Sequence, residues 1–166
     1  MTMRPVARPE VGARPLAAAR LGVPPPACGG EAGREARRGS VPPMSSAEHI
    51  AETVNRYISL IAKGTADDLV ELYADDATVE DPVGGEVHIG RQAIHGFYSA
   101  VENVQRECEL VTLRVAGNEA AFHFKLTVSA GDSRMVIEPI DVMAFDADGK
   151  IAAMKAYWSP ENARQI

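Results

Sequence analysis

Hydrophobic residues recur at helical spacing soon after residue 44. The motif Ser45-x-x-Glu48 is typical of a capping box, in which both side chains bond to free backbone N–H groups at a helix start. Apolar residues then follow three and four positions apart and share one helix face: Ile50, Val54, Tyr57, Ile58 and Ile61. Gly64 is a typical helix end. The pattern predicts an amphipathic helix between Ser45 and Gly64.

Two more helices and a short strand are predicted before residue 102. Thr65 can cap a second, shorter helix, which carries Leu69, Val70, Leu72 and Tyr73. A third helix is expected from about Gly90 to Val101, with these residues turned inward: Ile94, Phe97, Tyr98 and Val101. Between the two, residues 75–82 alternate like a strand, and Gly84-Gly85 turns the chain.

The second half of the chain alternates at the period of a β-strand. Strands are predicted over residues 107–115, 120–128, 135–145 and 151–158. Turn signals separate them at Gly117-Asn118, Gly131-Asp132 and Asp146 to Gly149, and Pro160 is expected to close the ordered part. Helices first and antiparallel hairpins last indicate an α+β fold. A strongly curved sheet wrapped over a helix would leave a pocket open at one end, which is a usual place for a ligand site.

Residues 1–43 differ from the rest of the 166-residue chain in composition. They hold eight of the eleven prolines, much Ala, Gly and Arg, and no apolar periodicity. We therefore expect a disordered extension, because too few large apolar side chains are present to offset the entropy of ordering. Arg14, Pro15 and Arg20 interrupt the one candidate for a secretory signal. The folded domain is expected to span residues 44–166.

The charge of the chain is divided in the same way. Residues 1–43 carry seven Arg and three Glu, a net charge of +4, whereas residues 44–166 carry ten basic and twenty acidic residues, a net charge of −10. An acidic domain is a poor candidate for nucleic-acid binding, which depends on basic groups that meet phosphates. No run approaches the ~18 consecutive apolar residues of a membrane span, so we expect a cytoplasmic protein. Cys28 and Cys108 lie in differently composed regions and predict no disulfide framework.

One acid lies on the inward side of the predicted strand. With period two, Asp81 shares a face with Ala77 and Val79, whereas Glu80 falls on the opposite face. A carboxylate that points into a core must be paired, neutralised or used. Asp81 is therefore a candidate base, and its neighbour Glu80 is the natural control.

A second acid and a tyrosine are predicted to face the same interior. Asp141 shares a strand face with apolar side chains and no cation, so burial should favour its neutral form, which can donate a hydrogen bond. Tyr57 lies on the apolar stripe of the first helix, where its hydroxyl needs a partner. Two donors beside a carboxylate suit removal of a proton α to a ketone, because they stabilise the charge that forms on the oxygen. That chemistry needs no cofactor, and the four histidines show no spacing that predicts a metal site.

Several runs of the sequence resemble the Δ5-3-ketosteroid isomerases. They are Tyr73 to Pro82, Arg56-Tyr57 with Gly64, Phe97-Tyr98, Pro139 to Phe145, and Ala156 to Ser159. The resemblance covers roughly residues 46–162. It implies a cone-shaped barrel of the cystatin-like, or NTF2-like, superfamily, in which a curved, mostly antiparallel sheet wraps around the N-terminal helices. It also implies a homodimer packed through its sheets.

The resemblance implies a role for each candidate residue. Asp81 would move a proton from C4 to C6 of a small-molecule 3-ketosteroid, and Tyr57 with protonated Asp141 would form the oxyanion hole. Tyr73 and Tyr98 match tyrosines that, in some members, hydrogen-bond to the oxyanion-hole tyrosine. Trp158 matches an apolar wall of the steroid pocket.

Some positions depart from the family pattern. They lie in the loop 82–87, at His95-Gly96 and in the segment from Val101 to Glu109, which contains Arg106. These departures bear on the pocket rim and on the choice of steroid. Two alternatives stay open beside the isomerase. One is a related enzyme of the same fold, such as a polyketide cyclase, a dehydratase or an epoxide hydrolase, and the other is a dimer that binds a steroid or lipid without turnover.

Overall fold

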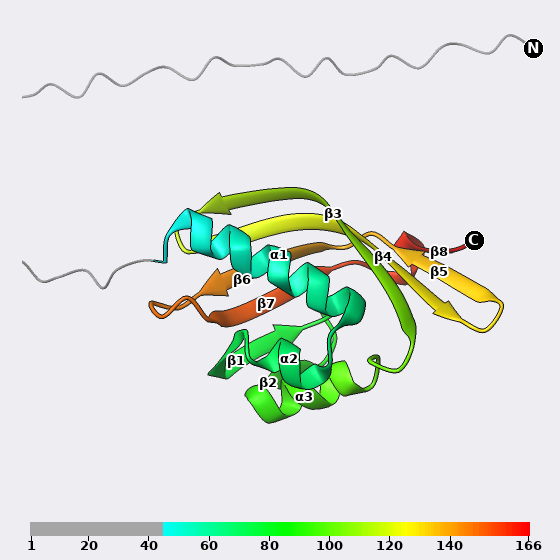
Figure 1. The fold of residues 1–166 in the computed structure, drawn as a ribbon, viewed down its shortest axis with the longest axis horizontal. Helices are drawn as coiled ribbons and strands as arrows, with labels where there is room; N and C mark the ends of the chain where they lie inside the picture. Colours follow the sequence, from blue (N-terminus) through cyan, green and yellow to red (C-terminus); the bar gives the residue numbers. More distant parts are fainter. Residues whose placement is uncertain (1–44) are drawn as a thin grey trace, which may run out of the picture. The chain divides into compact units, whose positions relative to one another are not determined.

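The computed structural model describes residues 45–166, which form a mixed helical and sheet domain (Figure 1). In chain order its elements are α1 (Ala47–Lys63), α2 (Ala66–Val70), β1 (Tyr73–Glu80), β2 (Val87–Ile89), α3 (Arg91–Ser99), β3 (Gln105–Ala116), β4 (Glu119–Ala130), β5 (Ser133–Ile137), β6 (Ile140–Phe145), β7 (Ile151–Tyr157), the 3₁₀ turn η1 (Pro160–Asn162) and β8 (Ala163–Gln165). The expected disordered extension over residues 1–43 lies outside the described residues. None of the helices in the described part is long and apolar enough to cross a membrane.

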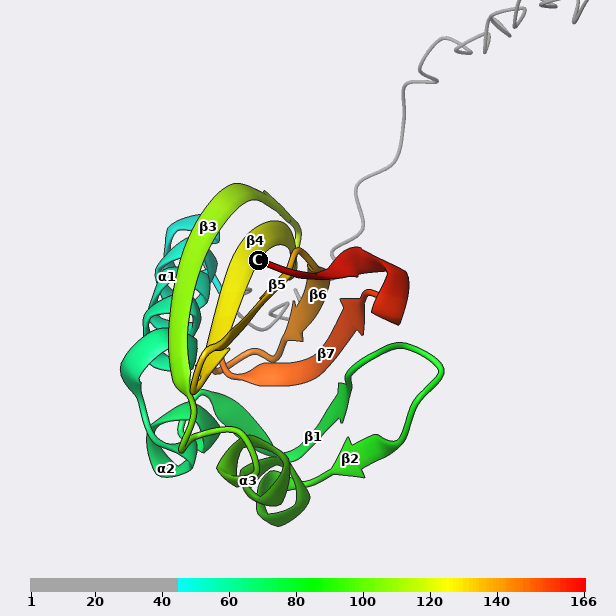
Figure 2. The ribbon, with the colours of Figure 1, turned by 90° about the vertical axis from the view of Figure 1, so that its right-hand side faces the viewer.

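The eight strands form one sheet in the order β2-β1-β7-β6-β4-β5-β8, and β3 pairs with β4. All pairs are antiparallel except β1 with β7, which is parallel. Figure 2 shows these strands in a curved arc, with α2 and α3 grouped beside β1 and α1 lying along β3. The predicted α+β fold with a curved, mostly antiparallel sheet is confirmed.

Helix α1 begins one residue later than the sequence pattern predicted. Ser46, not Ser45, is the N-cap, and its hydroxyl accepts a 3.1 Å hydrogen bond from the backbone N–H of His49. The Ser45 hydroxyl instead donates to the carbonyl of Asp146. The pattern could not separate the two adjacent serines, because either can cap a helix. The inward face is as predicted, since all five of its apolar residues are buried: Ile50, Val54, Tyr57, Ile58 and Ile61.

Helix α2 is shorter than predicted, and the strand after it starts earlier. Thr65 and Asp68 form a reciprocal capping box, but the helix ends at Val70. Tyr73 therefore opens β1 instead of closing a helix, and β1 ends at Glu80, so Asp81 follows the strand. The register explains the difference, because Tyr73 already pairs with Ile151 of β7. Strand β2, which pairs with the end of β1, was not predicted from the sequence.

The single strand predicted over residues 135–145 is in fact two strands. β5 ends at Ile137 and β6 begins at Ile140, with Glu138 and Pro139 between them. Proline has no N–H to donate to a strand ladder, so the pairing is interrupted there. As a result β4 pairs with β6 through its first half and with β5 through its second half.

The prediction that Pro160 closes the ordered part was wrong. The chain turns at η1 and continues into β8, which adds an antiparallel edge to β5. Pro160 stands at the first position of the 3₁₀ turn, where its missing N–H costs nothing.

Candidate active site

A cavity of about 380 Å³ lies between the sheet, α1 and α3. Its wall is mostly apolar and includes Phe97, Phe124, Leu126, Val128, Ile137 and Pro139. The three residues predicted as catalytic, Asp81, Tyr57 and Asp141, all line this one cavity. They come from the end of β1, the middle of α1 and the start of β6, so the fold gathers them from distant parts of the chain.

Tyr57 is held by packing and by a row of hydroxyl groups. It is buried, and its ring meets Phe122 edge to face with centroids 6.0 Å apart. The Tyr98 hydroxyl donates to the Tyr57 hydroxyl at 3.4 Å, and the Tyr98 and Tyr73 hydroxyls lie 2.7 Å apart. Burial, the largest cause, raises the pKa of all three phenols well above the usual value. Each phenol is therefore a neutral donor.

The two supporting tyrosines differ in position. Tyr98 lines the cavity and contacts Tyr57 directly. Tyr73 does not line the cavity, and its hydroxyl reaches Tyr98 instead of Tyr57. The structure thus arranges the three hydroxyls in the order Tyr73, Tyr98, Tyr57, and the last two of these tyrosines line the cavity.

Asp141 is buried opposite Phe122 in the β4–β6 ladder, with 1% of its surface exposed. Its Oδ1 has no hydrogen-bond partner among the described residues. Burial is the main reason that the pKa of Asp141 is raised well above the usual carboxyl value. The negative charge of Asp81 raises it further, and the Tyr57 hydroxyl acts in the opposite direction. Burial therefore favours the neutral form of this carboxyl group, which has a proton to donate.

Asp81 has a different environment from Asp141. It is half-buried, and the indole Nε1 of Trp158 donates a 2.6 Å hydrogen bond to its Oδ1. Burial raises the pKa of Asp81, while the Trp158 hydrogen bond and then His88 lower it. A carboxylate held by one strong donor, with a pKa moved toward neutral, is suited to act as a base.

Sequence reasoning missed this role of Trp158. The resemblance suggested an apolar wall, and Trp158 does line the cavity, but its indole also bonds Asp81. The parallel register that pairs Glu80 with Lys155 brings the ends of β1 and β7 together. A tryptophan N–H can only donate, which is the one signal that could have suggested an acceptor nearby.

Glu80 points away from the site, as the strand pattern predicted. Its Oε1 accepts a hydrogen bond from the backbone N–H of Gly84 at 2.8 Å, and Lys155 lies 3.5 Å from its Oε2. The Gly84 N–H is the main cause that lowers the pKa of Glu80. Glu80 is therefore a turn-stabilising residue outside the cavity.

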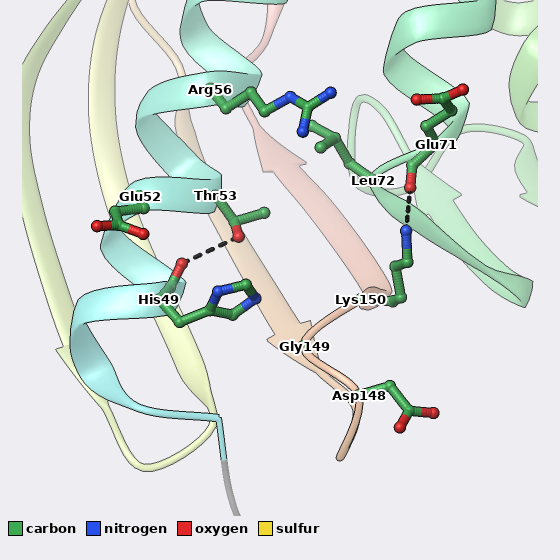
Figure 3. Close-up of a pocket in the computed structure, with 9 residues that line it drawn as sticks. All are labelled: His49, Glu52, Thr53, Arg56, Glu71, Leu72, Asp148, Gly149 and Lys150. Atoms are coloured by element: carbon green, nitrogen blue, oxygen red, sulfur yellow. Dashed lines mark hydrogen bonds between the residues drawn. The ribbon is translucent and has the colours of Figure 1, made fainter.

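A second pocket of about 270 Å³ lies at α1, away from these residues (Figure 3). Figure 3 shows α1 side chains facing the turn before β7, and the charged residues of the pocket are two cations, Arg56 and Lys150, and three acids, Glu52, Glu71 and Asp148. The Lys150 ammonium already donates to the carbonyl of Glu71. The lining of this pocket has one more acid than cations, and it includes none of the predicted catalytic residues.

No group of three or more His, Cys, Asp or Glu side chains comes together as a metal site within residues 45–166. Cys108 is a free thiol, and burial is the main cause that raises its pKa to about 12. A thiol that stays protonated is a poor nucleophile. The chemistry of the described residues therefore centres on the two carboxyl groups and the tyrosines of the cavity.

The chain is similar in sequence to known proteins. Residues 54–154 match the family model described as a SnoaL-like domain. A steroid Δ-isomerase of Nocardioides simplex is 47% identical over 111 residues, which cover 67% of this chain and 90% of that protein.

Two further relatives have a different activity in their names. The epoxide hydrolase LasB of Streptomyces lasalocidi is 29% identical over 143 residues, which cover 70% of this chain and 49% of that protein. Among solved structures, this chain superposes with a TM-score of 0.61 on SalBIII, an epoxide hydrolase/cyclase-like enzyme with a role in pyran ring formation in the polyether salinomycin. It is 26% identical and covers 70% of this chain and 95% of its own.

Proposed function

The chain belongs to the SnoaL-like domain family and is related to steroid Δ-isomerase, and we propose that it converts 3-oxo-Δ5-steroids into conjugated 3-oxo-Δ4-steroids. One observation carries the proposal. Asp81, Tyr57 and Asp141 line a single apolar cavity in a chain 47% identical to a steroid Δ-isomerase. A base and two neutral donors are the groups that proton transfer next to a ketone requires.

The proposed reaction is a proton transfer within one substrate molecule. The Asp81 carboxylate removes a proton from C4, and the C4–H electrons form a dienolate with negative charge on the 3-oxygen. Tyr57 and protonated Asp141 donate hydrogen bonds to that oxygen. Asp81 then returns the proton to C6, the carbonyl re-forms, and the C5–C6 double bond has moved to C4–C5. No atom is gained or lost, and no redox partner is used.

The different surroundings of the two acids support these roles. Burial raises both pKa values, but Asp81 is only half-buried and has a donor in Trp158, whereas Asp141 is almost fully buried and its Oδ1 has no partner among the described residues, so that only Tyr57 opposes the rise. Once Asp81 is ionised, its charge further disfavours ionisation of Asp141. The pair therefore supplies one base and one acid at the same pH.

A homodimer is part of the proposal. Ile140 and Tyr157 are cross-strand neighbours on β6 and β7, and about half of each side chain is exposed. Apolar groups on an open sheet face suit burial against a second copy. The expected cytoplasmic location also stays a prediction.

The isomerase proposal is tested with 5-androstene-3,17-dione, by following the ultraviolet absorbance of the conjugated enone. We expect turnover well above the buffer rate. Asp81→Asn should lower kcat by about 10²–10⁴-fold, the usual contribution of a positioned base, and leave steroid binding intact. The matched control is Glu80→Gln, which changes an acid one residue away and should keep wild-type activity.

Failure of these assays would identify the alternatives. A folded wild-type protein with no turnover would overturn the isomerase. If that inactive protein still bound a phenolic steroid such as equilenin, a binding dimer would replace it. High residual activity in Asp81→Asn would mean that another residue is the base.

A second candidate is epoxide opening, which the relation to epoxide hydrolase and epoxide hydrolase/cyclase-like enzymes favours. Protonated Asp141 could donate to an epoxide oxygen while Asp81 takes a proton from an attacking water or hydroxyl. Incubation with an epoxide bearing an internal hydroxyl, followed by mass and NMR analysis, separates this activity from steroid isomerisation.

A further inference from the structure

Arg106 is a buried cation in the wall of the same cavity. It stands near the start of β3, and 8% of its surface is exposed. Among the side chains that line the cavity it is the one basic group, and the other ionisable groups there are the two acids and two tyrosines. The proposed isomerisation uses no cation, so Arg106 has no part in the reaction described above.

The guanidinium group of Arg106 is only partly satisfied within residues 45–166. One terminal nitrogen donates to the carbonyls of Gly64 at 3.2 Å and Glu102 at 3.3 Å, while the buried Nε has no partner. Among the described residues no carboxylate forms an ion pair with Arg106, and the Glu102 carboxylate accepts from the N–H of Ala66. Burial lowers the pKa of Arg106, and Glu102 opposes this. A buried donor without an acceptor is costly, so an acceptor brought to this guanidinium group by a ligand would offset part of that cost.

The strand register places Arg106 far from the proposed oxyanion hole. On β4, Phe122 lies opposite Asp141 and Val128 lies opposite Arg106. These two β4 residues are six positions apart, a span of about 20 Å at the usual rise of a strand. Phe124 and Leu126 lie between them on the same face and line the cavity. The cavity floor therefore has a carbonyl-binding end at Asp141 and a cationic end at Arg106.

Arg106 also lines a neighbouring pocket formed by residues 62–65 and 102–106, which includes the two residues whose carbonyls it contacts, Gly64 and Glu102. Arg106 therefore borders both that pocket and the apolar cavity.

We propose that Arg106 binds a carboxylate at the end of the steroid distal to the reacting ketone. This inference rests on the proposed isomerase function and names its substrate class, 3-oxo-Δ5-steroids with an acidic substituent on the D ring. A guanidinium group matches a carboxylate better than a ketone, because it offers parallel N–H donors and a full charge. The apolar floor between the ends would contact the ring system.

The simplest competing role for Arg106 is structural. Its bonds to Gly64 and Glu102 join the end of α1 to the segment before β3. A purely structural arginine would not distinguish an acidic ligand from a neutral one. Discrimination between such ligands is therefore the decisive measurement.

The experiment compares 3-oxo-5-androstene-17β-carboxylate with its methyl ester in the full-length protein. Wild type should favour the acid in kcat/KM by about 10- to 100-fold, the value of a hydrogen bond to a charged group. Arg106→Leu should bring this ratio close to one, and Arg106→Lys should keep part of the preference. The matched control is Arg114→Leu, which removes an exposed cation of the same strand and should preserve the wild-type ratio.

Binding of the product-like 3-oxo-4-androstene-17β-carboxylate and its methyl ester is measured in parallel, without turnover. Equal Kd values for acid and ester in wild type would overturn the inference even if neutral steroids are isomerised well. A preference for the acid that is lost in Arg106→Leu would support it even if no steroid is turned over. If Arg106→Leu fails to fold, the acid-to-ester preference of wild type is compared with that of Arg106→Lys. A preference in wild type that is reduced in Arg106→Lys would support the inference, and an unchanged preference would overturn it.

Discussion

At the scale of single residues, two aspartates of one cavity differ in what surrounds them. Asp81 receives a 2.6 Å hydrogen bond from Trp158, whereas Asp141 Oδ1 receives none from the described residues. A donor favours the ionised form of a carboxyl group, and an apolar site favours the neutral form. Their opposite proposed roles thus follow from their neighbours.

Removal of the Trp158 donor should move the pH dependence of the reaction. Trp158→Phe keeps an aromatic wall but loses the hydrogen bond that lowers the pKa of Asp81. Asp81 must be ionised to act as a base, so the acidic limb of the kcat/KM profile should shift to higher pH. Tyr157→Phe, at the exposed neighbour, should leave the profile in place. An unshifted limb in Trp158→Phe would contradict this account.

Asp141→Asn should make the protein less sensitive to rising pH. The pKa of Asp141 is raised in the folded state, so the folded protein keeps a proton that the unfolded chain releases. Its contribution to stability is full below the unfolded pKa of about 4 and is lost as pH rises through the folded pKa. The variant lacks this dependence, so its free energy of unfolding relative to wild type should rise by up to about 1.4 kcal/mol per pH unit in that window.

Urea unfolding of wild type and Asp141→Asn at a series of pH values measures that difference directly. If the free energy of unfolding of the two proteins changed with pH in parallel, the pKa of Asp141 would not be raised in the folded protein. That result would contradict its proposed role as a neutral hydrogen-bond donor.

The sequence identified the candidate residues more successfully than it predicted the contacts between them. Asp81, Tyr57 and Asp141 could be located because an acid or a phenol on an apolar face is conspicuous. The contact between Trp158 and Asp81 could not, because it depends on the parallel pairing of β1 with β7, which no local pattern specifies. Arg106 was noticed only as a departure in composition, since its burial comes from packing of distant segments.

At the scale of elements, the helix cap offers a clear test. Ser46→Ala should lower the free energy of unfolding by about 1 kcal/mol, because it removes the acceptor for the His49 N–H. Ser45→Ala removes only a partly buried bond to the Asp146 carbonyl and should cost less. Thermal or urea unfolding measures the loss of stability in each variant. A larger loss in Ser45→Ala than in Ser46→Ala would indicate that Ser45 is the N-cap.

Helices and strands were predicted well where the hydrophobic periodicity is strong. They were predicted poorly where pairing with a distant strand decides where an element begins or ends. The inward face of α1 and the β3–β4 hairpin at Gly117 follow from local patterns. The division between β5 and β6 at Pro139 was missed because apolar residues continue on both sides of it. Strand β8 was missed because only its partner β5 makes it a strand.

At the scale of the whole molecule, the described residues that line the cavity lie between Tyr57 and Trp158. Deletion of residues 1–43 should therefore leave kcat and KM for 5-androstene-3,17-dione unchanged. Steady-state kinetics of both forms, with matched unfolding curves, tests this. A large loss of activity in a folded truncated protein would assign residues 1–43 to the working enzyme.

Strand β4 has a consequence for how this domain could change its substrate. It runs unbroken from Phe122, which pairs with Asp141, to Val128, which pairs with Arg106, and Phe124, Leu126 and Val128 line the cavity. Each pair of residues along the strand adds about 7 Å to the distance between the two ends of the cavity. Inserting or deleting two residues in β4 and in each strand that pairs with it would keep every side chain on its own face of the sheet. The change would lengthen or shorten the ligand that can reach both Asp141 and Arg106.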